Sequence, residues 1–444
     1  MYCAQLEVLF FSRSASCKMR LRCTLALLIA FGLGSPEPSC AYSVLTHEAI
    51  IDSAWDSDVR PALLKRFPGA THAELREAHA YAYGGAIIQD MGYYPHGSKF
   101  FSDLTHYVRS GDFVEALLRD STNLDEYAFA IGAMAHYVAD SDGHRLGTNV
   151  AEPLLYPPLK RKYGNVVTYE DDPLAHLKTE YGFDVLEVAK ERYAPDSYHD
   201  FIGFSVAQPL LERAFAETYG LDLRSLFGDE DRAIGSYRHD VSSIIPKATR
   251  IAWRLNKNEI RKDLPGITKK KFLYNLSRAS YEKNWGHNYQ PPTPGEKFLA
   301  FVYLIAPKIG PLRILAFRTP TPETEQLFEA SFNATLGHYR GLLQQLQDGS
   351  ISLPNVNIDV GEETGRGQYR LYDKACAELL NKLAANDFHD ASPELRAQLL
   401  HFYSEPAGLG DSKLKKKDRD KLESNLEHLK VARAMATASR AGAD

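Results

Sequence analysis

The chain has 444 residues, of which 44% are hydrophobic and 25% charged, with 52 basic and 57 acidic side chains and a formal charge of −5. This composition excludes a disordered chain or a fibre, because it supplies enough apolar surface for one large core or two smaller ones. The charge balance argues against a chain-wide nucleic-acid footprint, so phosphate chemistry must be local and we expect no stable nucleic-acid complex.

The first 41 residues have the layout of a secretory signal. An apolar run, Leu25–Leu33, follows two arginines and precedes a stretch that ends at Ala41. This run is shorter than the ~20 apolar residues needed to cross a bilayer, which disfavours a membrane anchor. Met19 stands just before the arginines and is an alternative start of the chain. We therefore expect cleavage after Ala41 and a secreted or periplasmic mature protein, in which Cys376 is the single thiol.

The pattern behind the signal is helical. Segments such as Ala73–Gln89, Leu124–Ala139 and Phe204–Tyr219 carry apolar residues at three- and four-residue spacing, whereas alternating, strand-like runs are few. We therefore predict an all-α protein, with a multi-helix domain over residues 42–250 and a helical extension of unknown role over residues 251–444.

One segment of the predicted extension allows two interpretations. Phe298–Ala306 is strongly apolar but only nine residues long. A buried helix is the favoured interpretation, and a patch that touches a membrane from one side is the alternative.

Histidine is the most informative residue type, since eight of the fifteen histidines fall between Tyr42 and Glu180. His136, Asp140 and His144 stand four residues apart in a segment of small and apolar residues. A four-residue step turns only ~40° around a helix, so His136 and Asp140 share a face and can bind one cation. We expect Gly143 to end this helix and to turn His144 in another direction.

A second pair, His176 and Glu180, repeats the four-residue step. A single pair of this kind is most often an ion pair on a helix surface. Two pairs in one segment favour a metal site, because a buried carboxylate beside imidazole needs a partner and a cation is a natural one. Imidazole nitrogen with carboxylate oxygen is a ligand set suited to zinc. Asp90, at the end of an apolar helix, and His106 are further candidates.

These motifs occur in an order that resembles a known family. The set consists of Tyr42-Ser-Val-Leu-Thr-His47, the segment from Gly84-Gly85 to Asp90-Met-Gly-Tyr, His106-Tyr107, the run from Phe129 through His136 to Asp140 with His144, and His176-x3-Glu180. Together they resemble the zinc-dependent phospholipase C family, which is related in fold to the S1/P1 nucleases and to the catalytic domain of glycosylphosphatidylinositol-specific phospholipase D. The resemblance covers roughly residues 42–220 and leaves the last half of the chain unexplained.

The resemblance implies three zinc ions in a cleft between helices. Asp90, His106, His136 and Asp140 would hold the first ion. Asp140 would bridge to a second ion, which also takes His47 and the amino group and carbonyl of Tyr42 as the mature first residue. His144, His176 and Glu180 would hold the remaining ion.

The chain departs from the family pattern in two places. The family usually begins with Trp, whereas this mature chain would begin with Tyr42, and we expect the site to survive because the backbone binds the metal. The interval between His144 and His176 is longer than in the compact bacterial phospholipases. Asp142, His96 and Glu170 are therefore the alternative ligands for the third ion.

Clustered zinc ions lower the pKa of a water molecule and stabilise charge on phosphoryl oxygens, so phosphodiester hydrolysis is the expected activity. The resemblance gives Asp90 the additional role of orienting or deprotonating the attacking water. Phospholipid is the favoured substrate class. An S1/P1-type nuclease is the enzymatic alternative, and an inert, metal-stabilised binding or envelope protein is the alternative of another class.

Overall fold

The computed structural model describes residues 44–189, 204–239, 317–405 and 416–441. In these ranges the chain is helical and contains no β-sheet; its single bridge joins Asn357 and Glu362. The α-helices are α2 (Val44–Ala54), α3 (Arg60–Arg66), α4 (His72–Gly85), α5 (Lys99–Tyr107), α6 (Ser110–Asp120), α7 (Leu124–Gly143), α8 (Asn149–Leu155), α9 (Pro157–Tyr163), α10 (Pro173–Ala189), α12 (Gln208–Tyr219), α13 (Glu230–His239), α18 (Pro322–Asp348), α19 (Arg370–Ala384), α20 (Pro393–Ser404) and α21 (Lys416–Ala441). The all-α prediction is confirmed.

Four short helical segments complete the described chain. They are the π-helical turns η1 (Trp55–Val59) and η3 (His144–Thr148) and the 3-10 helices η2 (Ile88–Tyr93) and η4 (Leu223–Leu226). Among the described residues, no helix combines the length and the apolarity that crossing a membrane requires. The secretory signal, Tyr42 and Phe298–Ala306 lie outside the described residues.

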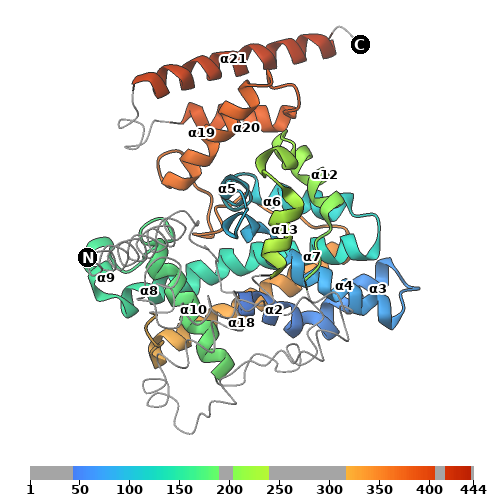
Figure 1. The fold of residues 1–444 in the computed structure, drawn as a ribbon, viewed down its shortest axis with the longest axis vertical. Coiled ribbons are helices and arrows are strands. Elements are labelled where there is room, and N and C mark those ends of the chain that lie inside the picture. The colour runs from blue at the N-terminus through green and yellow to red at the C-terminus, as the bar shows by residue number, and fades with distance from the viewer. Residues whose placement is uncertain (1–43, 190–203, 240–316, 406–415, 442–444) are drawn as a thin grey trace, which may run out of the picture.

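Helix α7 is the central element of the fold (Figure 1). Asn123 caps its start by accepting a hydrogen bond from the backbone N–H of Glu126 at 2.9 Å. Small and apolar residues dominate its sequence and nearly every side chain is buried, as expected for a helix enclosed by others. The small residues allow α4 to approach closely, because a Cβ on Gly132 of α7 would collide with the carbonyl oxygen of Ala82, and one on Gly85 with that of Phe129.

This close crossing leads to a stability prediction. We expect Gly132→Ala to destabilise the protein by roughly 1–3 kcal/mol, because the added methyl group forces α4 and α7 apart and overpacking costs more than alanine gains in helix propensity. The matched control is Gly337→Ala on the exposed face of α18, where nothing lies near the added methyl group. We expect this control to be neutral or stabilising by up to about 1 kcal/mol. Urea denaturation of both variants measures the difference, and equal midpoints would contradict the packing argument.

The C-terminal helices share the hydrophobic core of the N-terminal ones. Helix α18 packs along α7, and the Tyr339 hydroxyl donates a hydrogen bond to the Ile131 carbonyl at 3.2 Å. Helices α19, α20 and α21 lie together at the top of Figure 1, where α19 packs on α5. Buried side chains from residues 44–237 and 328–429 form one cluster. The predicted boundary at residue 250 lies outside the described residues and stays a prediction.

Two predicted helix limits differ from the structure, and a third agrees with it. The helix expected over 73–89 ends at Gly85, and the chain continues as η2. The helix expected from Phe204 begins only at Gln208, because Pro209 suits the first turn of a helix and not its interior. Helix α7 does end at Gly143 as expected, but that glycine keeps right-handed helical angles and His144 opens a π-helical turn. The side chain of His144 is therefore redirected by one wide helical turn and not by a sharp break.

Candidate metal centre

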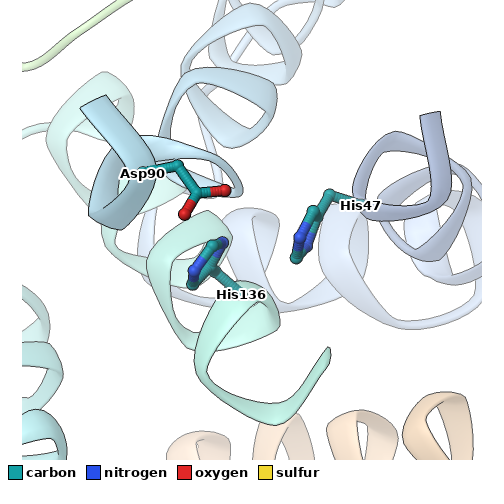
Figure 2. Close-up of side chains that lie close together, drawn as sticks. All are labelled: His47, Asp90 and His136. Carbon is teal, nitrogen blue, oxygen red and sulfur yellow. The ribbon is translucent and has the colours of Figure 1, made fainter. Parts of the chain in front are cut away.

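The first group of possible ligands consists of His47 from α2, Asp90 from η2 and His136 from α7. One ligand atom from each of the three residues lies within 4.8 Å of the other two. Figure 2 shows the two imidazoles and the carboxylate turned toward one another from three separate elements. All three side chains are buried.

The second group shares His136 with the first and adds His106 of α5 and Asp140 of α7. Asp140 is the hub, because its Oδ2 lies 3.0 Å from His136 Nε2 and 3.5 Å from His106 Nε2. Its Oδ1 lies 3.5 Å from His47 Nε2, so the carboxylate connects the two groups. His106 Nε2 also lies 3.3 Å from Asp90 Oδ1.

The third group consists of His144, His176 and Glu180. Glu180 Oε1 lies 3.3 Å from His144 Nε2 and 2.8 Å from His176 Nε2. The π-helical turn after α7 supplies His144, whereas α10 carries His176 and Glu180 four residues apart on one face. All three side chains are buried.

Backbone carbonyls fix the orientation of two histidines. His106 Nδ1–H donates to the Ser102 carbonyl at 2.8 Å, and His136 Nδ1–H donates to the Ala86 carbonyl at 3.0 Å. Each bond leaves Nε2 unprotonated in the neutral ring and directed at the group, which is the tautomer that a metal ligand needs.

Burial and mutual pairing shift the pKa values of these groups. Burial raises the pKa of Asp90. Burial also opposes ionisation of Asp140, but the neighbouring His136 and His106 outweigh it and hold the Asp140 pKa well below its usual range. For His106, burial lowers the pKa, yet the adjacent carboxylates of Asp140 and Asp90 raise it to about 10. The carboxylates thus attract positive charge into the buried site.

The donor atoms themselves are suited to a metal ion. Among the described residues, buried nitrogens and oxygens of these side chains lack a hydrogen-bond partner, namely His136 Nε2, both oxygens of Asp90, Asp140 and Glu180, and both ring nitrogens of His144 and His176. Buried polar atoms without partners are costly, and cations at these positions would satisfy them. A mixed set of imidazole and carboxylate donors matches the preference of zinc.

The structure separates the alternative ligands from the third group. Asp142 lies 2.9 Å from His338 Nδ1 and 3.3 Å from Arg145. Glu170 accepts a hydrogen bond from the backbone N–H of Arg370 at 2.7 Å. His96 is exposed, and its backbone φ is 66°. Of the five ligand candidates weighed for this group, His176 and Glu180 are the ones that face His144.

Sequence reasoning missed two buried carboxylates beside the third group. Glu152 Oε2 of α8 lies 3.4 Å from His176 Nδ1, and Asp359 Oδ1 lies 3.7 Å from His144 Nδ1. Burial raises the pKa of Glu152 to about 7. Neither residue stands three or four residues from a histidine of the group, which is the spacing that marked the other candidates.

Comparison with known families identifies the domain that contains these groups. Residues 46–228 match the model of the family described as zinc dependent phospholipase C. These residues belong to that family. No curated protein and no solved structure is significantly similar to the chain.

The match supports a phospholipase C-like hydrolase domain within residues 46–228. The matched range of this phospholipase C domain contains every candidate ligand from His47 to Glu180 and ends before the C-terminal helices. Asp359 therefore comes from outside the family domain, although it lies beside His144.

Proposed function

We propose that the protein is an exported zinc-dependent phosphodiester hydrolase that cleaves phospholipids in the manner of a phospholipase C. The observation that carries this proposal is the convergence of five histidines and three carboxylates, from separate helices, into three adjoining buried groups. The family match supplies the metal and the reaction class.

The proposed ligand assignment follows the expected one. Asp90, His106, His136 and Asp140 hold one ion; His47, Asp140 and the mature N-terminus at Tyr42 hold a second; His144, His176 and Glu180 hold a third. The position of Asp140 between His47, His106 and His136 supports its bridging role. Tyr42 lies outside the described residues, and its role rests on the expected cleavage after Ala41.

Zinc ions bound close together supply a water molecule of lowered pKa and Lewis-acid stabilisation of phosphoryl oxygens. The side chains of the protein supply the acid–base group and the buried environment of the site. Asp90 is the proposed proton acceptor, because both of its oxygens lack hydrogen-bond partners in the described chain and burial raises its pKa. An elevated pKa makes a carboxylate a better base at neutral pH. The buried environment also strengthens the interaction of the ligands with charge on the substrate.

Export and peripheral membrane contact are part of the proposal. The signal layout of residues 1–41 supports export, and the family is typically secreted. A phospholipid substrate lies in a lipid surface. We therefore propose that the enzyme binds this surface peripherally, from one side.

The nuclease alternative has one observation in its favour. Tyr93 and Tyr169 contact His106 and His176 edge-on, with ring centroids 5.8 Å and 5.7 Å apart, so aromatic rings border the site. Both rings are largely buried, however, whereas a nuclease needs open faces on which bases stack. Phospholipid therefore remains the preferred substrate.

A metal and substrate panel tests the proposed function. We expect purified mature protein to contain zinc and to release diacylglycerol from phospholipid vesicles. Treatment with 1,10-phenanthroline should abolish the release, because the reaction depends on the ions, and added zinc should restore it. Zinc content by mass spectrometry and product analysis by chromatography give the result. Zinc-loaded protein that cleaves single-stranded nucleic acid instead would establish the nuclease, and zinc-loaded protein without turnover on either substrate would establish the inert alternative.

A further inference from the structure

A turn from the C-terminal extension lies directly against the metal centre. It spans residues 357–362 and is closed by the bridge between Asn357 and Glu362. The Ile358 N–H donates a hydrogen bond to the carbonyl of His106 at 3.1 Å. On the other side, a Cβ on Gly361 would collide with the carbonyl of Ser141, next to Asp140. The turn is therefore fixed to the backbones of α5 and α7 beside residues of the second group.

Within this turn, Asp359 is held from several sides. Its Oδ2 accepts hydrogen bonds from the hydroxyls of Tyr107 at 2.8 Å and Tyr369 at 2.7 Å. Its backbone carbonyl accepts a hydrogen bond from Asn149 Nδ2 at 2.8 Å. The residue is only 3% exposed. One carboxylate oxygen is thus satisfied by two phenols, and the orientation of the other is fixed as a result.

That second oxygen, Oδ1, faces His144. It lies 3.7 Å from Nδ1 of His144, while Nε2 on the opposite side of the same ring lies 3.3 Å from Glu180. His144 Nδ1 has no hydrogen-bond partner in the described part of the chain. A buried carboxylate beside a ring nitrogen attracts the ring proton to that nitrogen, and the opposite nitrogen is then left for a metal.

The neighbouring histidine has the same arrangement. Glu152 Oε2 lies 3.4 Å from His176 Nδ1, and Glu180 Oε1 lies 2.8 Å from His176 Nε2. Both histidines of the third group therefore have Glu180 on the Nε2 side and a separate buried carboxylate on the Nδ1 side. The carboxylate behind His144 comes from the extension, about 180 residues beyond Glu180 in the chain.

From this geometry we propose that Asp359 is a positioning residue for His144. Its negative charge beside Nδ1 favours a proton on that nitrogen, holds the ring in place and leaves Nε2 to bind the third zinc ion. The C-terminal extension thus completes a metal site whose ligands all come from the phospholipase C domain. This inference rests on the proposed function, because it requires the third group to bind zinc.

Asp359→Asn tests the inference in the full-length protein. Carboxylates that orient a metal-bound histidine typically contribute 10–100-fold to metal affinity. We expect one zinc ion of the variant to bind 10–100-fold more weakly in chelator competition, with the other ions unaffected. The visible absorption spectrum of cobalt-substituted protein should also change, since the His144 ligand is reoriented, and Asp359→Glu should recover part of the affinity.

Glu115→Ala is the matched control. Glu115 Oε1 accepts the Leu353 N–H at 2.6 Å and so anchors the chain leading to the same turn, without touching His144 or Asp359. We expect this variant to lose some thermal stability but to keep wild-type zinc affinity and an unchanged cobalt spectrum. If both variants weaken zinc binding equally, Asp359 acts only by anchoring the turn and the inference is overturned.

Other outcomes are equally decisive. Wild-type zinc affinity and an unaltered cobalt spectrum in folded Asp359→Asn would overturn the inference and leave the proposed function intact. Wild-type protein that binds no zinc would instead overturn the proposed function. If Asp359→Asn does not fold, Tyr369→Phe provides the measurement, because it keeps the carboxylate and removes one of its two donors. We then expect a shifted cobalt spectrum, and an unshifted one would overturn the inference.

Discussion

Replacing Asp140 by alanine is expected to remove zinc from the first two groups and to abolish hydrolysis. The carboxylate lies 3.0–3.5 Å from three histidines, His47, His106 and His136, so no other side chain of the described site connects as many ligands. Without it, three imidazoles remain in a buried space with Asp90 as the carboxylate beside them. The substitution therefore removes the one carboxylate that approaches all three imidazoles, and with it a proposed ligand of both ions.

The loss of zinc should also lower stability. A ligand present at a thousand times its dissociation constant stabilises the folded state by about 4 kcal/mol, and the variant would lose this contribution for each ion that no longer binds. We expect the melting temperature of Asp140→Ala to be insensitive to added zinc, whereas that of the wild-type protein rises with zinc. Mass spectrometry of bound zinc, thermal unfolding with and without zinc, and diacylglycerol release measure the three effects.

Asp142→Ala is the control for this variant, because Asp142 stands two residues away on the same helix. Its carboxylate pairs with His338 and Arg145 near the surface and does not face the metal groups. Partly exposed ion pairs contribute about 0–1 kcal/mol, so we expect full zinc content and a small change in stability. Normal zinc content and hydrolysis in Asp140→Ala itself would show that Asp140 is not a metal ligand.

The parts of the site that the sequence could indicate are those encoded within one helix. His136 with Asp140, and His176 with Glu180, share a helical face because a four-residue step nearly completes a turn, and the structure places each pair together. The same local rule supports the all-α prediction, since helical periodicity needs no knowledge of distant contacts. The assignment of these residues as zinc ligands stays a prediction.

The parts that the sequence could not indicate depend on tertiary packing. Asp359 approaches His144 only because the turn at 357–362 bonds to the end of α5, and Glu152 approaches His176 because α8 and α10 pack together. Neither contact is marked by a periodic pattern in the sequence. The end of α4 was missed for a similar reason. Beyond Gly85 the apolar pattern persists, but the chain tightens into η2, where Ser102 accepts the Gly92 N–H at 3.0 Å.

Asp90→Asn is expected to lower kcat by about 10²–10⁴-fold with little change in KM, the range typical for loss of a general base. Asparagine has the shape of aspartate but is neutral and accepts no proton at working pH. The side chain is fully buried, and its carboxylate faces His106 at 3.3 Å, so the substitution changes charge without opening a cavity. Steady-state kinetics on phospholipid vesicles, together with zinc content, measure the effect.

The variants must separate the two proposed roles of Asp90, which are to bind zinc and to accept a proton. Asp90→Glu keeps a carboxylate, so it should retain zinc and recover part of the lost rate. If Asp90→Asn binds the full complement of zinc and is slow, the rate loss belongs to proton transfer; if adding excess zinc restores the rate, Asp90 acts as a ligand alone. Turnover at the wild-type rate would remove Asp90 from the mechanism, and the proton acceptor would then have to be sought among Glu180 and Glu152. Those residues are the remaining buried carboxylates at the third group that lack hydrogen-bond partners in the described chain.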